Sequence, residues 1–279
     1  MRQAWRGRAL LLTGVLLTCA PLASGQLALP RAPLPPAKHR VAVIAHRGGA
    51  ALAPENTLAA YRQAIALGVD YIEIDVRITR DRQLVVLHDA TVDRTTNGTG
   101  AIADLRLAEA RRLEAGMKFG PRYRGERIPT LDEVLHLCRG RVSIYLDHKA
   151  GPVWRLARTL RRHHMSRQTV VYAGLDRLQE WKRAAPDVPV MPSPGESCRT
   201  PDGLRQFLLG FPAEVLDGGV EGWSADLVRA AHVGGAAVYV DCLGIADTPA
   251  GRRAALAMGV DGIQTDHPDQ LLAELGQTR

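Results

Sequence analysis

The sequence predicts an α/β fold in which eight parallel strands close a (β/α)8 barrel. Short runs of β-branched and other apolar residues alternate with helical patterns along the chain, and such regular alternation is typical of a parallel sheet. The length of 279 residues suits one barrel, since barrels of this class commonly occupy about 250 residues. The predicted strands are 41–46, 71–78, 142–147, 169–173, 188–191, 214–217, 237–242 and 262–265.

The intervals between these strands carry helical patterns. Asn56 is a candidate cap for the first helix, which we expect at 57–67, because a short polar side chain can accept a hydrogen bond from the first helical turn. The other predicted helices are 131–138, 153–163, 175–184, 202–209, 225–232, 250–258 and 270–275.

Two distant segments, 66–75 and 257–266, share the pattern A-x-G-V-D-x-I-x-x-D. Each is expected to end a helix and begin a strand, because Gly readily adopts the left-handed conformation that closes a helix. Residues 90–128 break the alternation, with five Gly and one short helical pattern at 107–113. We interpret this segment as a small insertion on the barrel rim.

Residues 1–25 have the organisation of a secretory signal peptide. Three Arg precede an apolar run at 9–23, and small residues follow at 23–25, which predicts cleavage after Gly25 and export to the periplasm or the medium. A lipid attached at Cys19 is the alternative, although Thr18 disfavours it. A Pro-rich leader at 26–40 then precedes the barrel domain at 41–279.

The composition is that of a globular protein, with 46% hydrophobic and 23% charged residues. No later run is apolar enough for a membrane span. The formal charge falls from +7 to +4 without the three Arg of the signal, which is too little to indicate nucleic-acid binding. Cys138, Cys198 and Cys242 have no CxxC spacing, so free buried thiols are favoured, and one disulfide is left open.

Three carboxylates are candidates for a metal site. Along the strand 71–78, Glu73 and Asp75 share the face opposite to the apolar residues. Asp147 ends the strand 142–147 in the same alternating pattern. Carboxylates at the carboxyl ends of barrel strands lie where catalytic groups belong in this architecture, and oxygen ligands without Cys favour Mg²⁺ or Ca²⁺.

Two histidines and two cations complete the candidate site. His46 ends the first strand and His88 ends the apolar run 84–87. Arg47 follows His46, and Lys149 lies two residues beyond Asp147. Together with a metal they provide an acid, a base and positive charge for phosphoryl chemistry. The alternative to catalysis is a structural role in hydrogen bonding, which is the more common role for a single His at the end of a strand.

The motifs, taken together, resemble the glycerophosphodiester phosphodiesterase family. The matching segments are HRGG at 46–49, PENT at 54–57, EIDV at 73–76, HD at 88–89, DRTTNGTG at 93–100, IPTLDEV at 128–134 and GVDGIQTDHP at 259–268. The resemblance implies a TIM barrel and a metal-dependent hydrolysis that releases sn-glycerol 3-phosphate and an alcohol.

The resemblance also implies residue roles. His46 and His88 would form the acid/base pair, Glu73 and Asp75 would bind the metal, and Arg47 with Lys149 would hold the substrate phosphate. Asp147 stands at a metal position where the family usually has Glu. The segment VYVDC at 238–242 replaces the usual Trp-Thr-Val-Asn, which leaves Asp241 either a polyol ligand or an ordinary polar residue.

Two alternative functions follow from the same residues. One is a lipid phosphodiesterase related to sphingomyelinase D, which would use a similar pair of histidines on membrane substrates. The other is a phosphoester-binding protein that has lost catalysis. The PENT segment at 54–57 and the later barrel motif favour a small soluble substrate, and the presence of both His46 and His88 favours an enzyme.

Overall fold

The computed structural model describes residues 31–277. The predicted signal peptide at 1–25, with Cys19, and the first part of the leader at 26–30 lie outside the described residues. Within the described part, no helix is both long and apolar enough to cross a membrane.

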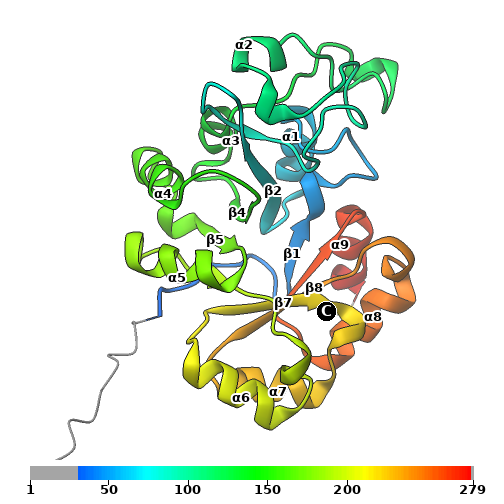
Figure 1. Cartoon of the computed structure of the whole chain (residues 1–279). Helices are drawn as coiled ribbons and strands as arrows, with labels where there is room; N and C mark the ends of the chain where they lie inside the picture. The colour runs from blue at the N-terminus through cyan, green and yellow to red at the C-terminus, as the bar shows by residue number, and fades with distance from the viewer. Residues whose placement is uncertain (1–30, 278–279) are drawn as a thin grey trace, which may run out of the picture.

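Eight parallel strands form a nearly closed barrel surrounded by helices (Figure 1). Their order is β6-β5-β4-β2-β1-β9-β8-β7, and the backbone N–H of Asp217 donates to the carbonyl of Pro192 at 3.0 Å across the remaining gap. All eight predicted strands are confirmed: β1 (Ala42–Ala45), β2 (Tyr71–Ile78), β4 (Ser143–His148), β5 (Thr169–Tyr172), β6 (Val190–Met191), β7 (Val215–Gly219), β8 (Ala237–Asp241) and β9 (Gly262–Thr265).

The helices of the outer ring follow the predicted order. They are α1 (Leu58–Leu67), α3 (Leu131–Cys138), α4 (Val153–Arg162), α5 (Leu175–Ala184), α6 (Pro201–Gly210), α7 (Ala225–Val233), α8 (Pro249–Met258) and α9 (Pro268–Gln277). Three of them begin at a Pro that the prediction left outside, because Pro lacks an N–H and is favoured in the first turn.

The predicted cap of α1 is wrong. The hydroxyl of Thr57, not the side chain of Asn56, accepts a hydrogen bond from the N–H of Ala60. Asn56 instead adopts a left-handed backbone conformation, with φ of 56°, a conformation that Asn tolerates better than most residues. Its side chain is therefore free to reach the end of β2.

The repeated A-x-G-V-D pattern has the predicted role. Gly68 and Gly259 follow α1 and α8 with φ of 86° and 83°. This left-handed conformation ends each helix and directs the chain into β2 and β9. The two junctions therefore have the same local structure although they lie far apart in the chain.

The rim insertion begins earlier than the predicted 90–128 and includes one strand that the sequence prediction did not count. β3 (Leu84–Val86) pairs with β2 in antiparallel orientation, outside the barrel order. The short helix α2 (Leu107–Ala110) ends earlier than predicted and lies at the top of Figure 1. The insertion has its own small apolar core, formed by Val85, Leu87, Val92, Ile102, Ala110 and Ile128.

The described part of the leader packs against the amino-terminal end of the barrel. Residues 31–40 contain neither helix nor strand, as predicted, but they are not separate from the packed domain. Ala32 is buried, and its N–H donates to Glu214 Oε1 at 3.0 Å. The hydroxyl of Tyr71, inside the barrel, donates to the carbonyl of Pro35. This segment therefore closes the end opposite to the predicted site.

The cysteines are buried and free. Cys138, Cys198 and Cys242 form no disulfide in the described chain, in agreement with the favoured prediction.

Candidate active site

One cavity at the carboxyl ends of the strands brings together all seven predicted site residues. Its volume is about 240 Å³. The predicted residues on its wall are His46, Arg47, Glu73, Asp75, His88, Asp147 and Lys149.

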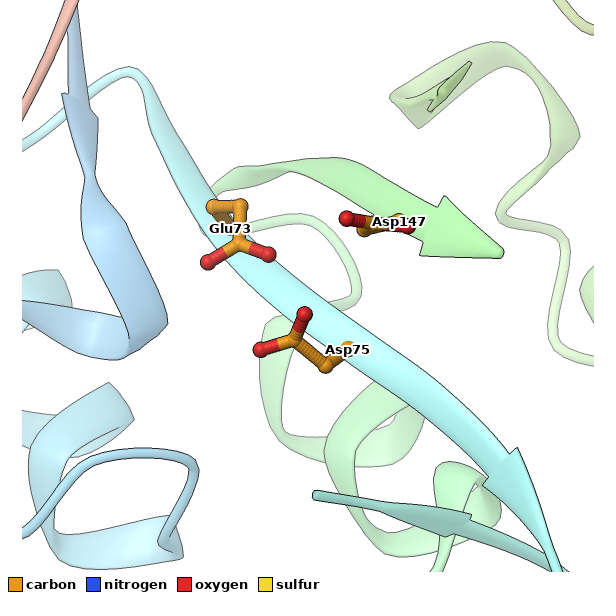
Figure 2. Close-up of side chains that lie close together, drawn as sticks. All are labelled: Glu73, Asp75 and Asp147. Carbon is orange, nitrogen blue, oxygen red and sulfur yellow. The ribbon is translucent and has the colours of Figure 1, made fainter. Parts of the chain in front are cut away.

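Strand register brings the three carboxylates together. Asp75 on β2 lies beside Asp147 on β4, and Glu73 precedes Asp75 by two residues on the same face. One oxygen from each carboxylate lies within 4.8 Å of the others, and Figure 2 shows the three side chains on the two neighbouring strands. Ile72 and Ile74, on the opposite face of β2, pack in the core between strands and helices. The predicted alternation is therefore what gathers the acids.

The electrostatics of this triad favour a bound cation. Burial raises the pKa of Glu73 well above its ordinary value, and repulsion from Asp75 and Asp147 adds to this effect. Burial likewise raises the pKa of Asp147, although Lys149 opposes the shift. A divalent cation among these oxygens would relieve the repulsion. The donor set consists only of carboxylate oxygens, which suits a hard cation such as Mg²⁺ or Ca²⁺.

Neighbouring groups fix the orientation of the triad. The side-chain amide of Asn56 donates to Asp75 Oδ2 at 2.8 Å, and the hydroxyl of Tyr61 donates to Asn56 Oδ1 at 2.7 Å. The backbone N–H of Arg47 donates to Glu73 Oε2 at 2.8 Å. These bonds leave the other carboxylate oxygens available to a ligand.

Each histidine is paired with its own carboxylate. Asp266 Oδ1 lies 2.7 Å from Nδ1 of His46, and Asp89 Oδ1 lies 2.7 Å from Nδ1 of His88. Such a pair directs the Nδ1 proton to the carboxylate and leaves Nε2 as the reactive nitrogen. Both histidines line the cavity, so each can exchange a proton with a group bound there.

A strained turn positions Arg47 at the triad. Arg47 has a left-handed backbone with φ of 50°, and Gly48 follows with φ of 88°. A Cβ on Gly48 would meet Cβ of Ala60 at 2.8 Å, so glycine is required for this close approach. Arg47 Nη1 donates to Glu55 at 3.0 Å. The buried Nε lies 3.7 Å from Asp75 and has no hydrogen-bond partner within residues 31–277.

Lys149 lies between two members of the triad. Its Nζ is 2.5 Å from Asp147 Oδ2 and 3.3 Å from Asp75 Oδ1. Burial alone would lower the pKa of Lys149, but the two carboxylates raise it above its ordinary value. The ammonium group of Lys149 therefore stays charged beside the candidate metal site.

The sequence analysis missed the groups that hold the catalytic candidates. Asp266 and Asp89 orient the histidines, and both belong to quoted motifs. Arg94 donates two hydrogen bonds to Glu55 and two to Asp89, at 2.6–3.0 Å. It thereby links the rim insertion to Arg47 and His88. The sequence offered one signal for each of these acids: Asp266 directly follows the strand that ends at Thr265, Asp89 follows His88, and Glu55 lies in the PENT motif.

Several further polar residues line the same cavity from the other strands. They include Tyr145, Tyr172, Asp217, Asp241 and Gln264. Asp241, which the sequence left between a ligand and an ordinary polar residue, thus lies in the cavity wall.

Comparison with known proteins gives consistent matches. A model of the glycerophosphoryl diester phosphodiesterase family matches residues 46–270. The chain is 33% identical to the Bacillus subtilis protein YhdW over 240 residues, which cover 83% of this chain and 97% of that protein.

Two solved structures show how far the similarity extends. A glycerophosphodiester phosphodiesterase from Agrobacterium tumefaciens superposes with a TM-score of 0.75 at 31% identity, covering 84% of this chain and 99% of that one. A phosphodiesterase from Oleispira antarctica, solved with its product sn-glycerol-3-phosphate, gives a TM-score of 0.74 at 26% identity over 84% of this chain and 96% of that one.

Proposed function

Because this chain belongs to the glycerophosphoryl diester phosphodiesterase family, we propose that it hydrolyses glycerophosphodiesters to sn-glycerol 3-phosphate and an alcohol with the help of a divalent cation. The observation that carries the proposal is the single cavity in which two histidine–carboxylate pairs face a triad of carboxylates.

Glu73, Asp75 and Asp147 would hold the cation, Mg²⁺ or Ca²⁺. When bound, such an ion supplies positive charge that polarises the phosphodiester and stabilises its transition state. The bonds from Asn56 and from the N–H of Arg47 hold Asp75 and Glu73 in place for this role. Asp147 has a shorter side chain than Glu, so its reach affects which cation fits best.

Arg47 and Lys149 would bind the phosphate oxygens. The Nε of Arg47 is buried and has no hydrogen-bond partner in the part of the chain that the structure describes, so a phosphate oxygen would satisfy it. Lys149 Nζ has two carboxylate neighbours and can donate a further hydrogen bond. Charged donors of this kind stabilise the charge that develops during phosphoryl transfer.

His46 and His88 would carry the two proton transfers. The attacking hydroxyl must lose a proton and the departing alkoxide must gain one, so one imidazole accepts at Nε2 while the other donates from Nε2. Asp266 and Asp89 would orient the two rings through Nδ1, which leaves Nε2 for the proton transfers. A protein that only bound phosphoesters would not need either pair.

The test is an assay of the purified mature protein after metal removal. We expect no release of sn-glycerol 3-phosphate from glycerophosphoethanolamine until Mg²⁺ or Ca²⁺ is added. Asp147→Glu should change the ratio of the activities with the two cations, whereas Glu196→Gln, at an exposed position, should not. Full activity without metal would exclude the cation role. Binding without turnover would support the binding protein, and preferential cleavage of sphingomyelin would support the lipid enzyme.

The proposal includes export of the protein. The basic, apolar and small residues of 1–25 are the support for it. Sequencing of the exported protein should begin at Gln26. A lipid-bearing amino terminus at Cys19 would contradict this processing and would support the lipoprotein.

A further inference from the structure

The β7 and β8 side of the cavity mouth carries carboxylates that lack cationic partners. Asp217 on β7, Asp241 at the end of β8 and Glu221 in the turn after β7 form what we call the acidic group. Within residues 31–277, none of them has a Lys, Arg or His at ion-pair distance. By contrast, most acids on the opposite side form ion pairs with Arg47, Arg94, Lys149, His46 or His88, and these acids are Glu55, Asp75, Asp89, Asp147 and Asp266. Glu73 accepts a hydrogen bond from the backbone N–H of Arg47 instead.

This arrangement is unfavourable without a ligand. The side chain of Asp217 is 3% exposed and accepts hydrogen bonds only from the neutral hydroxyls of Tyr145, at 3.0 Å, and Ser193, at 3.1 Å, in the described structure. Burial and repulsion from Asp241 raise the pKa of Asp217 well above its ordinary value. Burial also raises the pKa of Asp241, although His46, which already pairs with Asp266, attracts that carboxylate. Buried carboxylates gain free energy when a cation joins them.

A second observation points to a ligand with hydrogen-bond donors. Gln264 lines the same cavity, is 5% exposed, and donates from Nε2 to Asp241 Oδ1 at 2.5 Å. Its other amide atom, Oε1, is buried and has no hydrogen-bond partner in the described structure. An unpaired buried acceptor is costly, and a donor from a bound molecule would satisfy it.

Space for such a molecule adjoins the reaction cavity. Asp217 also lines a neighbouring cavity of about 230 Å³, whose walls include Glu221 and Trp223. Arg199 lines this cavity too, and its guanidinium group pairs with Glu196 at 2.7 Å. The carboxylate of Asp217 is thus shared between the place where the phosphodiester would react and this second space.

We propose that the acidic group and Gln264 form a subsite for the primary ammonium group of an amino-alcohol leaving group. This inference rests on the proposed function, because it identifies which phosphodiester the site prefers. A polyol would satisfy the acceptors but not the negative charge. A quaternary ammonium would supply charge but no N–H donor. A primary ammonium group supplies both.

The experiment compares kcat/KM for three substrates that share the glycerophosphate part. We expect glycerophosphoethanolamine to exceed glycerophosphoglycerol by about 10-fold or more, since hydrogen bonds between charged groups are stronger than those between neutral groups. Glycerophosphocholine should fall between them. Asp241→Asn should lower the ethanolamine-to-glycerol ratio by about 10-fold, because it removes the charge but can still accept from Gln264. The matched control, Asp187→Asn at an exposed position away from both cavities, should leave the ratio within about twofold.

Several results would overturn the inference. One is an equal loss of activity on all three substrates in Asp241→Asn, which would assign the subsite to the shared glycerol. Another is a preference for choline over ethanolamine, and a third is a second divalent cation per chain that Asp241→Asn removes.

A binding measurement separates this inference from the proposed function. Calorimetric titration of ethanolamine into the wild-type protein should give a binding signal that Asp241→Asn weakens by about 10-fold. Absence of turnover with all three substrates would refute the proposed function. Absence of ethanolamine binding, with turnover present, would refute the subsite alone.

Discussion

At the amino-terminal end of the barrel, the buried carboxylate of Glu214 pairs with Lys182 at 2.8 Å and accepts hydrogen bonds from the N–H groups of Ala32 and Val190. At the carboxyl end, Asp217 and Asp241 repel one another and have no ion-pair partner in the described chain. Glu214 therefore has a cation and backbone donors, whereas Asp217 and Asp241 have neither in the described chain.

The other buried polar groups show the same contrast. Asp70, below the barrel, accepts from the backbone N–H groups of Lys38, His39 and Val43. Near the mouth, Arg47 Nε and Gln264 Oε1 have no hydrogen-bond partner among the described residues. Satisfied groups stabilise the fold, whereas unsatisfied ones are retained where a ligand can complete them. Hydrogen-bond satisfaction of these groups, and not their burial, therefore distinguishes the amino-terminal end, which we call the structural end, from the carboxyl end, which we call the functional end.

The largest effect should come from the histidines of the functional end. His46→Ala and His88→Ala should each lower kcat by about 10²–10⁴, the usual contribution of acid/base catalysis, with little change in KM. Steady-state kinetics and thermal unfolding measure both properties. His136→Ala, at an exposed position on α3, is the control. Lower stability with unchanged kcat would show that these histidines are structural, and it would contradict the distinction between the two ends.

The structural end should respond in the opposite way. Lys182→Met should lower the free energy of unfolding by about 3–5 kcal/mol, because it leaves the Glu214 charge buried and unpaired. Activity per folded molecule should not change. Urea denaturation measures the effect, and Lys182→Met with Glu214→Gln should recover part of the loss. An active-site defect in the folded single variant would show that the two ends are coupled.

Orienting carboxylates should give an intermediate effect. Asp89→Asn and Asp266→Asn should each lower kcat by about 10–100-fold, the usual cost of removing a group that orients a functional histidine. The ring of His88 or His46 would then lose its anionic partner, while the packing around the ring would stay the same. Asp104→Asn, exposed in the insertion, is the matched control. Kinetics equal to the control would show that the backbone alone orients the rings.

The sequence predicted the barrel because its signals are local. Alternating apolar runs identify strands, and the left-handed Gly68 and Gly259 mark the junctions between helix and strand. β3 was missed because a three-residue strand carries too short a pattern to be distinguished from a loop. The packing of residues 31–40 could not be read either, because it depends on contacts with Glu214 and Asp70 that lie far away in the sequence.

The part of the candidate site that lies on a single strand could be predicted from the sequence. Glu73 and Asp75 follow from the alternation along β2, and the structure gathers all seven predicted residues in one cavity. The pairing of His46 with Asp266 joins residues 220 positions apart, so only the closed barrel reveals it. Asn56 was assigned to a helix cap because a short polar side chain suits both a cap and a bond to a carboxylate. In the structure its backbone is left-handed and its side chain donates to Asp75 instead.

The smallest expected effect concerns the stability of the functional end itself. Asp241→Asn should raise the free energy of unfolding by up to about 1 kcal/mol in protein without metal or substrate, because it removes a half-buried charge that has no ion-pair partner in the described structure. Asp247→Asn is the matched comparison. The carboxylate of Asp247 pairs with Arg252 and accepts from the hydroxyl of Thr265 at 2.7 Å, so the same chemical change there should destabilise the fold. Urea denaturation at neutral pH measures both variants. If Asp241→Asn destabilised the protein as Asp247→Asn does, the charge of Asp241 would already be compensated in the free protein, and the contrast between the two ends would not extend to the acidic group.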